Sequence, residues 1–74
     1  MKLVSLSGKE LCKVAEKLGF EKVRQSGSHV RYEHPDGRKT TIPVHGNEEI
    51  GKGLLVEILK QMEIKREEYE YLRK

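Results

Sequence analysis

The residues able to do chemistry gather within residues 25–46, which contain all three histidines of this 74-residue chain. His29 directly follows Gly27 and Ser28, and Arg31 comes two residues later, on the same side of an extended strand. Imidazole accepts and donates protons near neutral pH, and guanidinium binds phosphate, so this spacing suits acid–base chemistry on an anionic substrate. On spacing alone, an ordinary exposed strand histidine remains the more common occupant of such a position.

RNA cleaves itself when its 2′-OH is deprotonated and the pentacovalent phosphate is stabilised, which His29 and Arg31 could do without a metal or cofactor. His45 ends the third predicted strand and is a candidate for a second proton-transfer group, with a simple strand-end residue as the alternative. His34 precedes Pro35 in a turn and is interpreted as a surface residue. No metal site is predicted, because the histidine separations match no metal-ligand spacing.

Two amphipathic helices flank this stretch and must position it. Ser7 and Glu10 form the sequence of a capping box, and Gly19 is predicted to end the first helix with Phe20 folded back onto it. The apolar stripe of this helix is Leu11, Val14, Ala15 and Leu18. The second helix is predicted to begin near Lys52 with the stripe Leu54, Leu55, Ile58, Leu59 and Met62, and residues 66–72 form a helical tail that packs through Tyr69 and Leu72.

Three strands are predicted at residues 21–25, 29–34 and 38–45, with Asp36 and Gly37 in a hairpin turn. Pro43 lacks an N–H and places the third strand at or near a sheet edge, or makes it irregular there. The inward set is Val30, Tyr32, Thr40, Ile42 and Val44; the outward set is Lys22, Arg24, His29, Arg31, Lys39, Thr41 and His45. The pattern predicts an α+β fold with α-β-β-β-α order, a three-stranded antiparallel sheet, two helices on one face and a short helical tail. That is the layout of double-stranded-RNA-binding domains.

The composition bounds the rest of the interpretation. The formal net charge of +3 fits a phosphate-bearing partner without requiring one. Cys12 is alone, so no internal disulfide is expected, an intracellular setting is the default, and packing is its expected role. No apolar run approaches the roughly 18 residues of a membrane span. Residues 1–74 are predicted to form one domain.

Several short motifs, in order, resemble the HicA family of small toxins from HicA–HicB toxin–antitoxin systems. They are SGKE (7–10), GF (19–20), RQSGSHVRY (24–32), HPDGR (34–38), IPVH (42–45), GLL (53–55) and ILKQ (58–61). The resemblance extends to about Ile64, and the tail beyond it carries no implied role. Val30 is a departure, since many family members have a polar residue or a second histidine there.

The resemblance implies a double-stranded-RNA-binding-domain-like fold and a cytoplasmic mRNA interferase, a metal-independent endoribonuclease that inhibits translation. It implies a HicB-type antitoxin partner, and it identifies His29, in the family's Gly-Ser-His motif, as the catalytic general acid or base. The residues expected to bind RNA are Gly27, Ser28, Arg31, Arg24, Lys39 and His45, and no cofactor or membrane is expected. Two alternatives stay open: a non-catalytic RNA-binding module of the same fold, and a plain interaction protein that docks a partner on its sheet.

Overall fold

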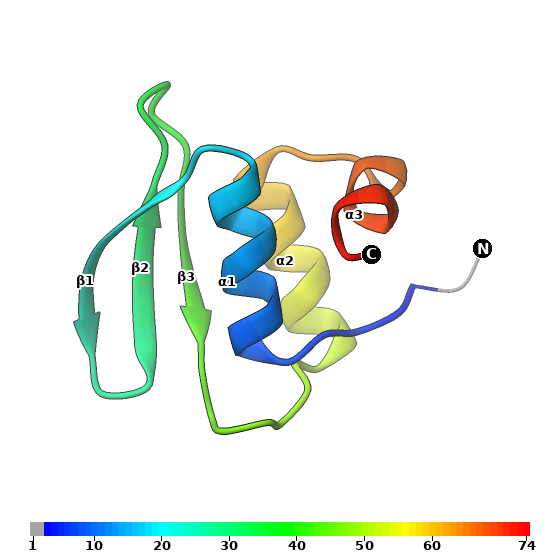
Figure 1. Ribbon diagram of the computed structural model, residues 1–74, viewed down its shortest axis with the longest axis horizontal. Helices are drawn as coiled ribbons and strands as arrows, with labels where there is room; N and C mark the ends of the chain where they lie inside the picture. The colour runs from blue at the N-terminus through cyan, green and yellow to red at the C-terminus, as the bar shows by residue number, and fades with distance from the viewer. Residues whose placement is uncertain (1–2) are drawn as a thin grey trace.

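The computed structural model describes residues 3–74 (Figure 1). Its elements are α1 (Gly8–Lys17), β1 (Glu21–Ser26), β2 (His29–Glu33), β3 (Lys39–Pro43), α2 (Lys52–Met62) and α3 (Arg66–Leu72). The strands pair antiparallel in the order β1-β2-β3, so β3 is an edge strand, as Pro43 indicated. The predicted α+β fold, with the layout of double-stranded-RNA-binding domains and a short helical tail, is confirmed.

The ends of α1 follow the chemistry of its sequence. The backbone N–H of Glu10 donates to the Ser7 hydroxyl at 3.3 Å, and the backbone N–H of Ser7 donates to the Glu10 carboxylate at 3.0 Å. This second hydrogen bond holds the pKa of Glu10 below its usual value. At the other end, Gly19 has φ +96° and the N–H of Phe20 donates to the Ala15 carbonyl. The capping box and the glycine C-terminus are therefore confirmed.

The helices and the sheet enclose one apolar core. α1 and α2 lie side by side and both contact β3, while every residue of β1 is exposed, so the sheet extends beyond its helical cover (Figure 1). The predicted inward residues Val30, Tyr32, Thr40 and Ile42 are buried, and so are the α2 residues Leu55, Ile58, Leu59 and Met62. Leu54 is the exception to the predicted stripe: it is 46% exposed, because it lies at the border of the buried face of α2.

A register shift in β1 overturns the prediction that Lys22 faces outward. Arg24 pairs with Arg31, but Lys22 pairs with the inward-facing Tyr32, and the irregularity falls between Lys22 and Arg24. The extra residue at this bulge is Val23, which reverses the alternation for the residues before it. Lys22 therefore lies on the helix side of the sheet.

His34 is half-buried, so its interpretation as a surface residue is wrong. Its ring packs edge-on against Phe20 with the centroids 5.1 Å apart, and its Nε2 lies 3.0 Å from the Leu18 carbonyl. The N–H of Asp36 donates to its Nδ1 at 3.1 Å, and an Asp36 carboxylate oxygen lies 3.0 Å from the same nitrogen. His34 thus ties the β2–β3 hairpin to the end of α1 and takes no part in an open site.

The tail helix α3 completes the core from the far side of α1. Tyr69 is fully buried and its hydroxyl donates to the Val4 carbonyl, and the Lys17 ammonium donates to the Leu72 carbonyl at 3.0 Å. The predicted contacts of Tyr69 and Leu72 are confirmed. Within the described residues 3–74, no helix has both the length and the apolar character needed to cross a membrane.

Candidate active site

His29 stands at the start of β2, on a turn that is held from both sides. Gly27 has φ +59°, a conformation that glycine adopts without strain, and its carbonyl accepts from the Gln25 side chain at 3.0 Å. On the other side the N–H of Val44 donates to the Ser28 carbonyl at 2.6 Å. Gly27 and Ser28 thus shape the turn that presents His29, an exposed residue on the outward face, and their binding of RNA stays a prediction.

Beside His29 the outward face forms a shallow basic hollow of about 140 Å³. Its lining residues are Arg24, Ser26, His29, Arg31 and Thr41. Arg24 lies directly opposite Arg31 across the strands, and Arg31 donates to the Thr41 hydroxyl at 3.2 Å. The Arg31 Nε lies 3.7 Å from a Glu33 carboxylate oxygen, which offsets part of the repulsion between the two opposed arginines, and an anion bound between them would offset the rest. We call this site, defined by those five residues, the basic hollow.

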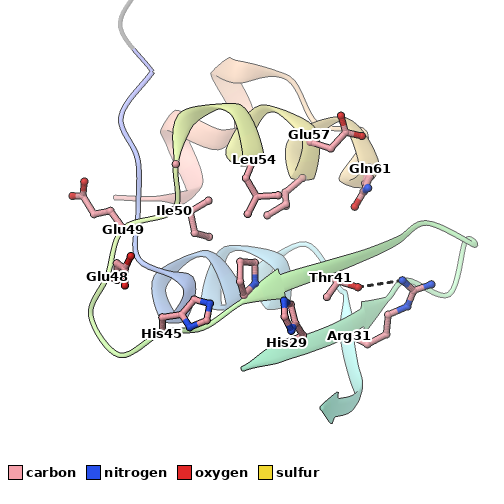
Figure 2. A pocket seen from close by; sticks show the side chains of 13 residues that line it. His29, Arg31, Thr41, His45, Glu48, Glu49, Ile50, Leu54, Glu57 and Gln61 are labelled. Carbon is pink, nitrogen blue, oxygen red and sulfur yellow. Dashed lines mark hydrogen bonds between the residues drawn. The ribbon is translucent and has the colours of Figure 1, made fainter. Parts of the chain in front are cut away.

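His45 lies close to His29, although β3 ends two residues before it rather than at it as expected. The two imidazole centroids are 6.4 Å apart and the rings are nearly perpendicular, at 84°. The arrangement brings a second exposed proton donor and acceptor within reach of a group bound at His29 (Figure 2). Lys39 is exposed at the other end of β3, opposite Glu33, and lines neither the basic hollow nor the groove described next.

On the opposite side of His29 a groove of about 550 Å³ separates the strands from α2 (Figure 2). The strand wall consists of His29, Arg31, Thr41, Pro43 and His45; the α2 wall of Leu54, Glu57, Ile58 and Gln61; the loop end of Glu48, Glu49, Ile50 and Gly51. The outward face is therefore not open to solvent throughout, because α2 borders it along the β3 edge. We call this site the α2 groove.

Sequence reasoning missed the α2 side of this groove. Leu54, Glu57 and Gln61 are spaced by three and then four residues, which places them in one row on the helix. That row was the available signal, but Leu54 was assigned to the core stripe. The row faces the groove because α2 packs beside β3. The sequence of the helix alone does not specify this packing.

The two sides of His29 differ in charge. The basic hollow contains two arginines and no carboxylate among its lining residues. The α2 groove contains Arg31 but also Glu48, Glu49 and Glu57. A phosphate would therefore be favoured on the basic side and disfavoured at the acidic rim of the groove.

Cys12, the free cysteine of the described chain, lies outside both sites. Burial raises the pKa of the Cys12 thiol, and the half-buried side chain packs against the core, which agrees with its predicted packing role. Within residues 3–74 no three His, Cys, Asp or Glu side chains form a group that could hold a metal ion.

The chain was compared with known protein families and with curated proteins. A scan against protein families matches residues 8–64 to the HicA toxin of bacterial toxin–antitoxin systems. That range covers most of the chain, including α1, all three strands, the Gly27–Ser28 turn and α2, and it ends before α3. A search of curated proteins found no match. With the fold, the motifs and the family match in agreement, the chain belongs to the HicA family of toxins.

Proposed function

We propose that this HicA-family protein is an mRNA interferase, a cytoplasmic endoribonuclease that cleaves mRNA and thereby inhibits translation. The observation that carries the proposal is the exposed His29 imidazole, which adjoins both the basic hollow and the His45 ring. Acid–base groups and cationic groups are the two requirements of RNA transesterification.

In the proposed reaction the scissile phosphate binds between Arg24 and Arg31 in the basic hollow. His29 removes the proton from the adjacent 2′-OH, and the 2′-oxygen forms a bond to phosphorus. The bond from phosphorus to the 5′-oxygen breaks, and that oxygen takes a proton from His45. The products are a 2′,3′-cyclic phosphate and a free 5′-OH, and side chains supply every proton and every positive charge without a metal ion.

Membership of a toxin–antitoxin family implies an antitoxin partner. We propose that this partner is of the HicB type and that it inhibits the toxin by covering the surface around His29. The exposed imidazole and the basic hollow would then be inaccessible to RNA in the complex.

The test is cleavage of a long single-stranded RNA by purified protein in EDTA, with His29→Ala beside the wild type. Loss of a general acid–base group is expected to slow cleavage by about 10²–10⁴-fold. Lys60→Ala, which changes an exposed residue of α2 that lines neither site, is the matched control and should cleave like the wild type. Equal cleavage by His29→Ala, with its fold verified by circular dichroism, would refute the catalytic role.

A second function is favoured by the basic hollow alone: a non-catalytic RNA-binding module. Such a module would bind RNA with steep salt dependence, cleave nothing, and keep its affinity after His29→Ala. Removal of Arg24 or Arg31 would weaken its binding. Binding without cleavage by the wild type would therefore select this function over the nuclease.

A further inference from the structure

We propose that the α2 groove is a nucleobase subsite and that Gln61 is the residue that reads the base next to the cleaved bond. The proposal deepens the ribonuclease function and rests on it. In the proposed reaction the arginines bind phosphate and the histidines transfer protons. Gln61 would add a residue that determines which RNA sequence is preferred.

The side chain of Gln61, an exposed residue of α2, is hydrogen-bonded to a buried residue of β3. Thr40 is only 1% exposed, and its hydroxyl donates to the Gln61 Oε1 at 2.8 Å. This hydrogen bond occupies the carbonyl end of the amide, and among the hydrogen bonds of residues 3–74 none uses its Nε2. Figure 2 shows the side chain extending from α2 toward the strands. The hydrogen bond from Thr40 thus directs the remaining N–H donor of the amide to the groove, and a directed donor can discriminate between hydrogen-bonding patterns.

The walls of the groove suit a flat, uncharged ring. Leu54 is 46% exposed and lines the groove together with Pro43 and Ile50, so apolar contacts are available to the face of a base. The acidic rim disfavours a phosphate there but does not repel a neutral base. The basic residues that suit a phosphate and the apolar residues that suit a base thus lie on opposite sides of His29.

The two sites share a wall, which lets one nucleotide occupy both. His29, Arg31 and Thr41 line the basic hollow and also the α2 groove. A nucleotide whose phosphate lies between the arginines can therefore extend its base past His29 and Thr41 into the groove. Single-stranded RNA is recognised in this way, through unstacked bases that insert into protein sites.

The polar groups favour bases with an exocyclic amino group. Glu57 lies one turn before Gln61 in the same helical row and offers carboxylate acceptors beside the Gln61 donor. Adenine and cytosine present an amino donor next to a ring-nitrogen acceptor, and guanine presents an amino donor with a carbonyl acceptor on the same edge. Uracil has no amino group; its only donor, N3–H, lies between two carbonyl oxygens, which repel a carboxylate that approaches to accept from it. Weaker occupancy of the groove by uracil is therefore expected beside Glu57.

The test uses binding of short 2′-O-methyl oligonucleotides, which cannot be cleaved by transesterification, measured by fluorescence anisotropy at fixed salt. The quantity compared is the affinity for the adenine homopolymer divided by the affinity for the uracil homopolymer. Gln61→Glu keeps an acceptor for the Thr40 hydroxyl but replaces the donor, and should lower this ratio by about fivefold, the effect of one hydrogen bond. Lys60→Gln changes the net charge by the same amount away from the groove and should leave the ratio unchanged.

Each result separates the subsite from the nuclease. A ratio that is unchanged in Gln61→Glu, or wild-type protein that binds neither oligonucleotide, overturns the subsite. If the ratio is unchanged while Gln61→Glu and Leu54→Ala weaken only the complex with the antitoxin, the groove belongs to the protein partner and the proposal is wrong. Base-selective binding that depends on Gln61, without cleavage of unmodified RNA, would support the subsite and refute only the nuclease.

Discussion

A glycine at the start of α1 holds the helix against the strand that carries the site. A Cβ added at Gly8 would lie 2.0 Å from the Pro43 carbonyl oxygen and 2.9 Å from the Cα of Val44. Both atoms belong to the backbone and cannot move aside by a change of rotamer. Gly8→Ala must therefore push α1 and the end of β3 apart, and Pro43 lies directly opposite His29 in the sheet.

Gly8→Ala is expected to destabilise the protein, although replacing glycine by alanine in a helix usually stabilises it. Glycine to alanine in a helix ordinarily stabilises by about 0.5–1 kcal/mol. Overpacking of a closely packed contact costs about 1–3 kcal/mol, so the structure predicts a net loss in the free energy of unfolding. The free energy of unfolding of a domain of this size is roughly 4–11 kcal/mol. Each lost kcal/mol should lower Tm by about 4–8 °C.

The assay is thermal and urea unfolding followed by circular dichroism, with Gly53→Ala as the matched control. Gly53 also lies in the first turn of a helix, but an added Cβ there meets nothing within 4 Å. Gly53→Ala should therefore stabilise the protein while Gly8→Ala destabilises it and slows RNA cleavage. Equal or higher stability of Gly8→Ala would refute the close contact between α1 and β3.

Three further predictions concern burial, pH and charge. Leu55→Ala should cost about 2–5 kcal/mol in the free energy of unfolding, whereas Leu54→Ala, at an exposed position, should cost under about 0.5 kcal/mol in the same urea titration. Burial raises the pKa of Tyr69 to about 12, so the folded state retains a proton that the unfolded chain loses above pH 10.0, its usual pKa. Stability should fall as pH rises through this window, and less in Tyr69→Phe; an identical alkaline profile would contradict it. Arg24→Gln should reduce the slope of log affinity for RNA against log salt by about one, and an unchanged slope would remove Arg24 from the phosphate contacts.

The sequence predicted those parts of the fold that depend on local chemistry. The capping box at Ser7, the left-handed Gly19 and the Asp36–Gly37 hairpin each act within a few residues, and each is found where the sequence placed it. The tail at residues 66–72 likewise follows from helical periodicity and the buried Tyr69. Such signals need no knowledge of the rest of the chain.

The errors arose where distant parts of the chain decide the outcome. The bulge at Val23 moved Lys22 to the other face, and strict alternation has no means to anticipate an inserted residue. His34 is half-buried because Phe20 and the Leu18 carbonyl meet it from the end of α1. Leu54 lies outside the core because α2 packs along the β3 edge with Leu55, not Leu54, facing inward.

The candidate site divides in the same way. His29 with Arg31 could be named from spacing along one strand, but the opposition of Arg24 and Arg31 depends on the register between two strands. The approach of His45 to His29 depends further on the chain after β3 turning back toward the start of β2, fixed by the hydrogen bond from Val44 to Ser28. The more segments a contact joins, the less of it a single sequence can specify.

Under the proposed function, the separation of charge around His29 limits how RNA can lie on the protein. If the backbone follows the basic hollow and avoids the acidic rim, a strand can enter the α2 groove only with its bases and not with its phosphates. The residues that bind most strongly, Arg24 and Arg31, then carry no sequence information, while Gln61 adds little affinity but distinguishes bases. Loss of an arginine should weaken cleavage at all sites alike, whereas loss of the Gln61 donor should redistribute cleavage among sites. A uniform decrease from both substitutions, mapped on one long RNA, would contradict this division of roles.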